Sequence, residues 1–391
     1  MFVEIVGDGQ SVKLIAPGRF KDNSSAPANR GQFTARIFTG VNPFRELASE
    51  CAGVEEFTTT PMQSHIWNLA CAESFPDGGP VLVTVQRQGK TVAFAPLFRP
   101  RGQKRLLFLG QSLFEPTLFA YADDESCYAL AQALLKLKDP IFLRDVDASS
   151  PMVPALQQAC RAGKRVCITR SMPSHPWLRL NESWRRPEEH LNSGRRSDLR
   201  RARRIAEKNG LLTFLNINPA PAELDELLTE VFRVESANWK GKAGSGLAHD
   251  PAIQGFFRRY CQLACEQGIL RILLMRCDDQ TAAVQLGVDY KQRFWLLKMG
   301  YDQHFARCSP GELLMVESLR FAAERGLEGF EFTGTRESWT HKWTDMAHPS
   351  VSVRIYAAGF HGPMEFAVEI TKAAARRAAK LLLRKKTEEA K

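Results

Sequence analysis

The sequence has no CxxC pair and no long hydrophobic run. Its nine cysteines are scattered over 391 residues, and only Cys261 and Cys265 stand at helical spacing. This usage argues against a metal site, so we expect none. The first residues include Glu4 and Asp8 and no long apolar segment, which predicts neither a signal peptide nor a membrane-spanning helix. Scattered cysteines in a chain without an export signal favour the reducing cytoplasm.

Basic residues outnumber acidic ones in two segments, and these segments make the chain basic, with a formal net charge of +10. Residues 185–208 carry nine Arg or Lys against four acids, and residues 371–391 carry eight against two. Basic clusters attract the phosphates of lipids, nucleotide-linked substrates and nucleic acids. The first segment lacks interleaved aromatic residues and no nucleic-acid-binding module is recognisable, so nucleic acid is not the expected partner.

Each basic segment has two interpretations. Residues 185–208 include Ser197 as a candidate helix cap, and they either contact a phosphorylated acceptor or a membrane, or form a solvated helix that joins two domains. The C-terminal segment is either a solvated tail or a helix lying on an anionic membrane, because its cations alternate with an apolar stripe. This stripe consists of Phe366, Ile370, Ala374, Ala378 and Leu382. A cytoplasmic protein, peripheral at the inner face of a membrane, is therefore one expectation.

Residues 293–334 form the most informative stretch, because they predict a strand, a loop, a helix and a second strand in one run. Side chains alternate over residues 293–299 in a strongly β-favouring sequence. Ser309 then fits the N-cap of a helix, Pro310 its first position, and Glu312 completes a Ser-x-x-Glu capping box. Gly326 marks the end of this helix, and residues 327–332 are extended.

The start of this helix is a candidate phosphate site. Gly311 lies in the first turn, where backbone N–H groups are open to an incoming pyrophosphate. The alternative is an ordinary capped helix, in which Glu312 satisfies those donors and repels anions. Over the second half, the predicted order is strand, helix, helix, three strands, helix and strand. Besides the elements above, it comprises strands at 211–217, 269–277 and 282–290, helices at 222–239 and 251–267, a short pattern at 336–343 and a last strand at 351–357.

Three motifs within this order carry a family resemblance. They are residues 235–241 (ESANWKG), Tyr301-Asp302 leading to Ser309-Pro310-Gly311, and Lys342-Trp343. The chain resembles the CelD-like (cellulose-biosynthesis) branch of the GNAT acyltransferases from about residue 34 to about residue 358. The resemblance implies a mixed α/β, tandem GNAT-like N-acyltransferase fold that uses acyl-CoA, with Ser-Pro-Gly in place of the usual Gly-rich loop. The FemAB-like transferases, which depend on aminoacyl-tRNA, share the doubled architecture and remain a competing interpretation.

The first half repeats the order of elements with little sequence similarity. Its loop at 110–122 lacks the Ser-Pro-Gly start, so we expect this half to shape the acceptor cleft and not to bind a cofactor. The predicted strands lie at 34–38, 81–85, 91–97, 105–109, 141–146 and 165–169, and the helices at 43–51, 64–75, 126–138 and 152–162. The expected segments are an N-terminal extension (1–33) with a mobile loop at 18–33, a degenerate GNAT-like half (34–182), a basic joining helix (183–210), a GNAT-like acyltransferase half (211–360) and a basic C-terminal helix (361–391).

Acyl transfer to an amine requires a base, and Glu235 is the first candidate. It stands beside Trp239 and Lys240, where burial would raise the pKa of its carboxylate towards neutrality. The alternative is a structural ion pair with Lys240. Asp302 is the second candidate, with a plain turn residue as its alternative. Amide donors at residues 298–300 are placed to hold the acyl-CoA carbonyl.

The remaining candidates follow from the resemblance. Tyr301 would protonate the leaving thiolate, or pack as an ordinary aromatic residue. Lys342 would contact negative charge on the acceptor or transition state, or form a cation–π contact with Trp339 or Trp343. His304 and His341 are secondary proton carriers. The predicted cofactor-binding residues are Lys298, Met299, Gly300, Ser309, Gly311 and Glu312, and the predicted acceptor-binding residues are Gln63, Trp67, Trp239, Lys240 and Trp343.

Together these observations predict an N-acyltransferase that uses acetyl-CoA or a longer acyl-CoA and no metal. The expected acceptor is an amine of an envelope component: an amino sugar, a polysaccharide precursor or a sphingoid-type lipid base. Two alternatives stay open, a FemAB-like aminoacyl-tRNA-dependent transferase and a non-catalytic accessory protein of an exopolysaccharide or cellulose synthase.

Overall fold

The computed structural model describes residues 3–6, 9–13, 33–75, 77–237 and 250–359, together with positions 364 and 371. Residues 3–6 and 9–13 are described by their backbone alone. The predicted mobile loop, apart from its last residue, and the predicted C-terminal helix, apart from two positions, lie outside the described residues. The same holds for Trp239 and Lys240.

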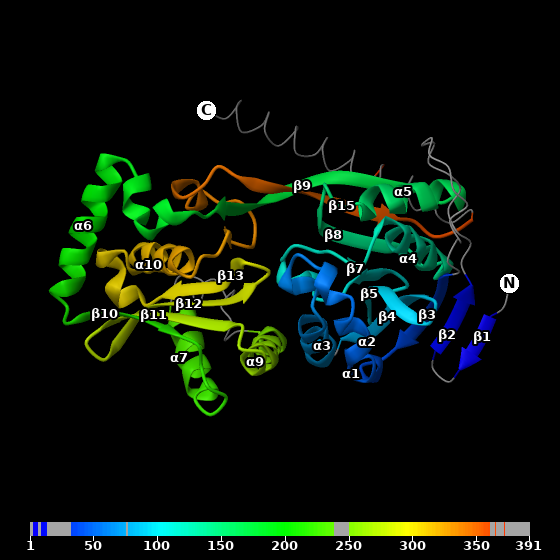
Figure 1. Ribbon diagram of the computed structural model, residues 1–391, viewed down its shortest axis with the longest axis horizontal. Helices are drawn as coiled ribbons and strands as arrows, with labels where there is room; N and C mark the ends of the chain where they lie inside the picture. Colours follow the sequence, from blue (N-terminus) through cyan, green and yellow to red (C-terminus); the bar gives the residue numbers. More distant parts are fainter. Residues whose placement is uncertain are drawn as a thin grey trace, which may run out of the picture.

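One mixed sheet runs through the molecule, and fifteen of its strands belong to the described residues (Figure 1). The strand order is β1-β2-β3-β4-β5-β6-β8-β15-β9-β14-β13-β12-β11-β10, and β7 pairs with β5 off this path. The bounds are β1 (Val3–Val6), β2 (Gly9–Lys13), β3 (Phe33–Thr39), β4 (Gly78–Arg87), β5 (Lys90–Pro100), β6 (Leu106–Phe108), β7 (Ala120–Tyr121), β8 (Ile141–Asp147), β9 (Cys167–Arg179), β10 (Leu212–Ile217), β11 (Leu270–Cys277), β12 (Gln280–Tyr290), β13 (Arg293–Tyr301), β14 (Gly329–Glu331) and β15 (Ala347–Ile355).

Each half contains one parallel pair of strands with a helix between them in the sequence. In the first half β6 pairs with β8 across α4 (Asp124–Lys136), and in the second half β13 pairs with β14 across α10 (Pro310–Glu324). A parallel pair needs such a crossover, because the chain must return to the end of the sheet where the first strand began before it can run in the same direction again. The two halves therefore repeat one architecture, and the predicted mixed α/β, tandem GNAT-like fold is confirmed at this level.

Helices cover both faces of the sheet. In the second half, α7 (Leu224–Ser236) and α9 (Pro251–Glu266) share one core with Trp295 and Leu297 of β13. On the opposite face, α6 (Ser193–Glu207) and α10 pack with Phe294 and Leu296. The first-half helices are α1 (Asn42–Glu46), α2 (Ala48–Ala52) and α3 (His65–Ser74) on one face, and α4 and α5 (Met152–Ala162) on the other.

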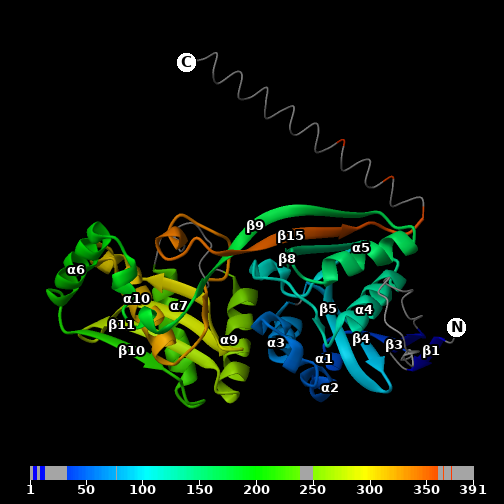
Figure 2. The same ribbon diagram turned by 45° about the horizontal axis from the view of Figure 1, so that its top comes forward.

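The halves exchange strands. The last strand, β15, pairs with β8 and β9 of the first half, and the end of β9 pairs with β14 of the second half. Figures 1 and 2 show β9 and β15 side by side across both halves. The expected segment boundaries at residues 182 and 360 therefore divide the chain without dividing the sheet.

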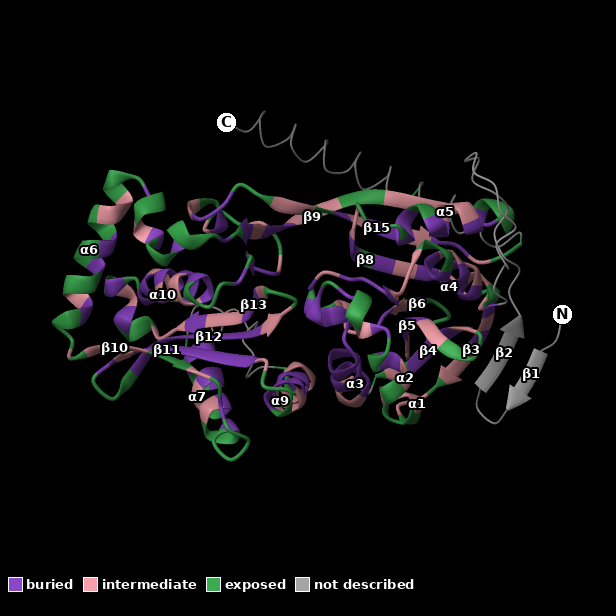
Figure 3. Cartoon of the chain, viewed as in Figure 1, coloured by how far each residue is buried: buried purple, intermediate pink, exposed green. Residues whose placement is uncertain are grey.

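A shared hydrophobic core also joins the halves, at the contact between α3 and α9. The Trp67 ring of α3 lies 4.8 Å from the rings of both Phe256 and Tyr260 of α9, in edge-to-face geometry. Beside this cluster, Arg259 of α9 donates to Glu73 of α3 at 2.6 Å. Figure 3 colours α3, α9 and the neighbouring strands largely as buried, whereas much of α6 is exposed. The apolar contact is therefore central to the molecule.

The structure differs from the predicted elements where long-range pairing outweighs local pattern. The strand expected at 165–169 extends to Arg179, although the added residues include two prolines and show no regular alternation, because β15 and β14 pair with it. The helix expected at 43–51 is divided at Leu47. Ser197 was wrongly predicted as the cap of the basic helix: the Asn192 side chain accepts from the Arg195 N–H, because α6 begins five residues earlier than predicted.

Candidate active site

The site is built around a gap between the parallel strands β13 and β14. Their pairing begins at Arg293 with Gly329 and stops at Trp295 with Glu331. Just beyond, the Thr333 hydroxyl donates to the Leu296 carbonyl, and β13 continues to Tyr301 paired with β12 on its other edge. On the side of β13 that faces β14, no described strand pairs with residues Leu297 to Gly300. We call this stretch the open edge of β13.

A β-bulge in β13 changes which side chains face which helices. The register with β12 shifts between Leu286, opposite Lys298, and Gly287, opposite Leu296, so that Leu297 is an extra residue. Such a bulge breaks the strict alternation of a strand. Lys298 therefore lies over the Phe257 ring of α9 at 5.0 Å, whereas Met299 packs on the α10 side. The predicted alternation, which placed Lys298 with Phe294 and Leu296, is wrong for this reason.

The N-terminus of α10 follows the end of β13. Ser309 adopts a left-handed conformation with φ of 46°, and its side chain caps no N–H group of the described residues. The predicted capping box is therefore wrong, because Glu312 turns away and pairs with Lys342. At Gly311 an added Cβ would lie 3.7 Å from Tyr301 Cδ1 and 3.9 Å from Met299 Cε. The first turn of α10 thus keeps backbone donors without a side-chain cap, beside the end of β13.

A pocket of about 310 Å³ lies between this helix start, α6 and the short 3-10 turn Thr340–Lys342. Four of its lining residues are cations and two are acids, Asp198 and Glu312. Burial, and then repulsion from Arg195, lowers the pKa of Lys342. An anion entering the pocket would relieve that repulsion. The lining residues are Leu191, Arg195, Asp198, Leu199, Arg201, Ala202, Ile205, Arg307, Ser309, Glu312, Lys342 and Trp343.

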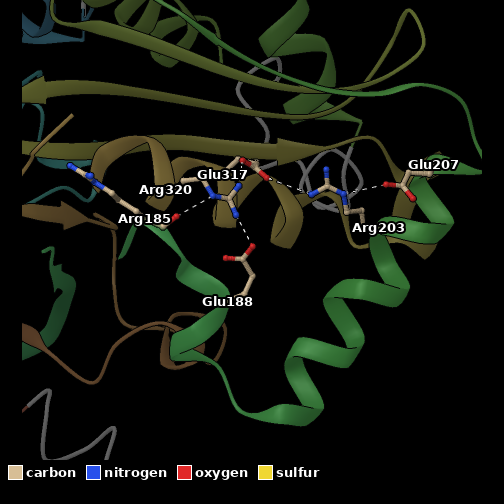
Figure 4. A network of polar contacts seen from close by, with 6 residues as sticks. All are labelled: Arg185, Glu188, Arg203, Glu207, Glu317 and Arg320. Carbon is tan, nitrogen blue, oxygen red and sulfur yellow. Dashed lines mark hydrogen bonds and ion pairs between the residues drawn. The ribbon is translucent and has the colours of Figure 1, made fainter. Parts of the chain in front are cut away.

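The basic helix α6 forms one wall of this pocket, and polar contacts hold it on α10 (Figure 4). Arg203 of α6 lies 4.0 Å from Glu317 of α10, and Arg320 of α10 lies 2.6 Å from Glu188 in the segment before α6. Leu199 of α6 is buried in the core that this helix shares with α10. Although α6 joins the halves in sequence, Figures 1 and 2 show it at the end of the second half that is farther from the first.

Residues 193–342, from the start of α6 to Lys342, match the family of the acetyltransferase (GNAT) domain. These residues form a GNAT acyltransferase domain. No protein of curated function matches the chain. The GNAT domain thus includes the basic helix that we expected to be a joining segment. The CelD-like branch stays a prediction.

Three solved structures share the fold of most of the chain. They are FemX (13% identity, TM-score 0.53, covering 83% of this chain and 98% of that one), the C-terminal domain of a protein described as a lysylphosphatidylglycerol synthetase from Agrobacterium fabrum (13%, 0.51, 85% and 96%), and L-PGS from Bacillus licheniformis (10%, 0.52, 84% and 96%). At these identities the likeness concerns the fold alone.

The GNAT domain places the predicted catalytic residues on two faces of its sheet. Glu235, at the end of α7, is only 2% exposed and packs on Gly300, where an added Cβ would lie 2.4 Å from Glu235 Cα. Tyr301 and Lys342 lie on the α10 face. Asp302 caps the following 3-10 turn by accepting from the His304 N–H at 2.9 Å. This contact suits the alternative interpretation of Asp302 as a turn residue. The fold therefore does not bring the candidate base Glu235 close to the cation Lys342.

The predicted acceptor-binding residues of the first half lie in its packed interior. The Gln63 amide donates to the Phe119 carbonyl at 2.7 Å, and its side-chain oxygen accepts from the Thr59 and Thr60 N–H groups at 2.9 and 3.1 Å. Trp67 fills the contact with α9 described above. Trp343 is buried and lines the pocket. Contact of Gln63, Trp67 and Trp343 with an acceptor stays a prediction.

Glu115, which the first half contributes to the edge of the GNAT domain, was not predicted from the sequence. Its Oε1 lies 3.8 Å from Lys298 Nζ, and its Oε2 accepts from the Gly334 N–H at 3.2 Å. Burial raises the pKa of this carboxyl, while Lys298 and the Gly334 N–H oppose the rise. No periodicity or motif in the loop at 110–122 singles out this residue, because its partners follow more than 180 residues later.

The described residues contain no helix long and apolar enough to cross a membrane. Among the same residues, no three His, Cys, Asp or Glu side chains are grouped so that they could hold a metal ion. All nine cysteines are free thiols, and eight of them are buried.

Proposed function

We propose that the GNAT domain transfers the acyl group of acetyl-CoA or a longer acyl-CoA to an amine of an envelope polysaccharide or lipid precursor. The observation that carries this proposal is the start of α10. It has no side-chain cap among the described residues, and it opens into a pocket with four cations at the end of a strand whose edge is open. Backbone donors at a helix N-terminus and nearby cations favour a bound phosphate.

Each part has a role in this proposal. The N–H groups around Gly311, with Arg195, Arg201 and Arg307, would bind the phosphates of acyl-CoA. The open edge of β13 would align the acyl group, with its amide donors at the carbonyl oxygen where negative charge develops. Tyr301, beside Gly311, would protonate the leaving thiolate.

Lys342 would exchange its partner when the co-substrate binds. In the structure its ammonium pairs with Glu312 at the pocket wall. A phosphate or an acceptor anion competes for the same donors, because the pocket holds more cations than acids. The ion pair would thus keep the pocket closed to weak anions.

The acceptor class and the location belong to the same proposal. One neighbour in fold is described as a lysylphosphatidylglycerol synthetase, which favours a lipid or envelope acceptor here. Most cations of α6 are exposed, and they suit an acceptor held at an anionic membrane by a cytoplasmic protein. Sedimentation with anionic vesicles tests this part, and binding that is absent or insensitive to salt would contradict it.

The first experiment is calorimetric titration of the full chain with acetyl-CoA and with a long-chain acyl-CoA. We expect saturable binding, and a loss of about 100-fold or more in the Gly311→Asp variant, because a carboxylate would stand where the phosphate binds. Gly255→Asp is the matched control. Gly255 lies in α9, where an added Cβ meets nothing within 4 Å, so this variant should bind as the unaltered protein does.

A FemAB-like, aminoacyl-tRNA-dependent transferase is the second candidate. FemX shares the fold over 83% of this chain, and this observation favours the alternative. Ribonuclease treatment separates the two candidates, because it should abolish activity only if aminoacyl-tRNA is the donor. Absence of binding to either acyl-CoA, together with ribonuclease-sensitive transfer, would replace the first proposal with the second.

A further inference from the structure

A buried polar cluster lies where the two halves meet at the gap between β13 and β14. It draws on the loop before β7, on β8, on β9, on β13 and on the residues after β14. Glu115, Asp145 and His175 of the first half are 6%, 2% and 3% exposed. Lys298 and Gly334 of the second half complete the cluster. Buried ionisable groups are uncommon unless packing or chemistry requires them.

Glu115 bridges the two sides of the gap. One carboxylate oxygen faces Lys298, the first residue after the bulge in β13, at 3.8 Å. The other oxygen accepts from the N–H of Gly334, which follows β14, at 3.2 Å. The strands that part here belong to the GNAT domain, but the carboxylate between them comes from the first half. The distance of 3.8 Å leaves the ammonium group of Lys298 without a close hydrogen bond to this carboxylate.

His175 gives a second, independent observation at the same place. Its Nδ1 contacts the Gly334 carbonyl oxygen, whereas its Nε2 is buried and has no hydrogen-bond partner among the described residues. A buried polar atom without a partner costs free energy, about 1–3 kcal/mol. Such an atom therefore indicates a site for a ligand that supplies the missing partner.

The backbone around the cluster is held in an uncommon conformation. Asp145 and Thr333, both non-glycine residues, have φ of 55° and 52°. Left-handed backbone at such residues costs free energy and gathers at functional sites. Both residues are buried, and Thr333 directly precedes the Gly334 N–H that contacts Glu115. The strain thus lies at the groups that position the carboxylate.

We infer that Glu115 is the general base of the transfer reaction, supplied by the first half to the open edge of the GNAT domain. This inference rests on the proposed function. The acceptor nitrogen attacks the thioester carbonyl, the N–C bond forms and the C–S bond breaks. The Glu115 carboxylate takes the proton that the nitrogen loses, and Tyr301 gives its proton to the leaving thiolate of CoA, so the products are an amide and free CoA. Proton exchange with solvent then restores both side chains. Lys298 and His175 are positioning residues in this step.

The electrostatic surroundings raise the pKa of this carboxylate above that of an ordinary glutamate. Burial raises the pKa of Glu115, and Lys298, the Gly334 N–H and His175 moderate the rise in that order. Burial also raises the pKa of Asp145, which faces His175 and Arg144. A base whose pKa lies closer to the working pH transfers protons more effectively. The rate should therefore fall as the pH falls through the raised pKa.

The test compares Glu115→Gln with Glu73→Gln in the full chain. Both carboxylates belong to the first half and face a cation of the second, Lys298 and Arg259, but Glu73 lies at the α3–α9 contact. Release of CoA thiol is measured with acetyl-CoA and a long-chain acyl-CoA, using glucosamine and sphinganine as amine probes. Glu115→Gln should lower kcat about 10²–10⁴-fold and abolish the acidic limb of the pH profile. Glu73→Gln should stay within about twofold.

Calorimetric binding of acyl-CoA separates this inference from the proposed function. Glu115→Gln should bind acyl-CoA as the unaltered protein does, and Glu115→Asp should recover part of the rate, because a carboxylate is restored. If the unaltered protein transfers acyl groups and Glu115→Gln keeps both its rate and its acidic limb, Glu115 is not the base and the proposed function stands. If the unaltered protein neither binds acyl-CoA nor acylates either amine, the proposed function and the role of Glu115 as its base are both wrong.

Discussion

The helices α4 and α10 occupy the same place in the two halves, yet their N-termini differ. Each follows the first strand of a parallel pair. Asp123 caps α4 by accepting from the Ser126 N–H at 2.8 Å, and Asp124 and Glu125 add negative charge to its first turn. At α10 the Ser309 side chain caps no described N–H group. One helix start is closed to anions and the other is open, because acids and a cap neutralise the first.

This difference indicates that the two halves of a duplicated fold can have different roles in one reaction. The loop that leads to α4 carries no Ser-Pro-Gly start, and it instead brings Glu115 to the edge of the GNAT domain. In our proposal the second half binds the co-substrate and the first half supplies the base. The expectation that the first half binds no cofactor agrees with the closed start of α4 and stays a prediction.

The largest predicted effect asks whether the halves are separable. Trp67→Ala removes a buried ring between Phe256 and Tyr260 of the other half, and it should lower the free energy of unfolding by about 3–5 kcal/mol. Because the core is shared, both halves should unfold together at a lower denaturant concentration. Two separate transitions in circular dichroism and tryptophan fluorescence would show that the halves are independent.

The second prediction makes α10 resemble α4. Ser309→Asp adds a negative charge at the open start of the helix, and Asp is tolerated at the positive φ of this residue. Acyl-CoA affinity measured by calorimetry should fall about tenfold or more, which corresponds to about 1.4 kcal/mol. Asp124→Ser, which removes a negative charge from the first turn of α4, is the control and should leave affinity unchanged. Equal affinity in both variants would remove the functional difference between the two starts.

The smallest predicted effect compares two carboxylates that cross between the halves. Burial raises the pKa of Glu115. For Glu73, burial is outweighed by hydrogen bonds from Arg259 and Arg45, which lower its pKa. Folding therefore favours the protonated form of Glu115 and the ionised form of Glu73. The stability that Glu115 contributes is present at low pH and lost as the pH rises through its folded pKa. Glu73 contributes stability at higher pH and loses it on acidification.

Thermal unfolding of the two Gln variants at several pH values checks this prediction. Relative to the unaltered protein, the Tm of Glu115→Gln should rise as the pH increases from the ordinary pKa of glutamate through the raised pKa of Glu115. The Tm deficit of Glu73→Gln should instead shrink as the pH falls from the ordinary pKa of glutamate through the lowered pKa of Glu73. The same slope for both variants would contradict the opposite pKa shifts.

Much of the fold could be predicted because its signals are local. Alternation identified β12 and β13, apolar periodicity identified α5 with its observed bounds, and Pro310 identified the start of α10. The capping box failed although its residues were present. The Ser309 backbone became left-handed, and a cation 30 residues away attracted Glu312. The local sequence does not show whether Glu312 will join the capping box or pair with Lys342.

The site was harder to predict than the elements that carry it. Ser309, Glu312, Lys342 and Trp343 do meet at one pocket. Glu235 lies on the other face of the sheet, and Arg195 and Arg201 enter the pocket from α6. From its composition alone, a helix rich in Arg is predicted to be solvated. Its role as a wall follows from its packing on α10.

By itself the sequence determined the order of strands and helices in each half, the two basic segments and the Pro-Gly start of α10, since these depend on neighbouring residues and on chain periodicity. Only the tertiary structure decided that β15 enters the sheet of the first half, that a bulge turns Lys298 towards the other half, and that Glu115 reaches Gly334. The physical reason is that pairing and burial join groups far apart in the chain, and their free energies arise only when the halves have packed.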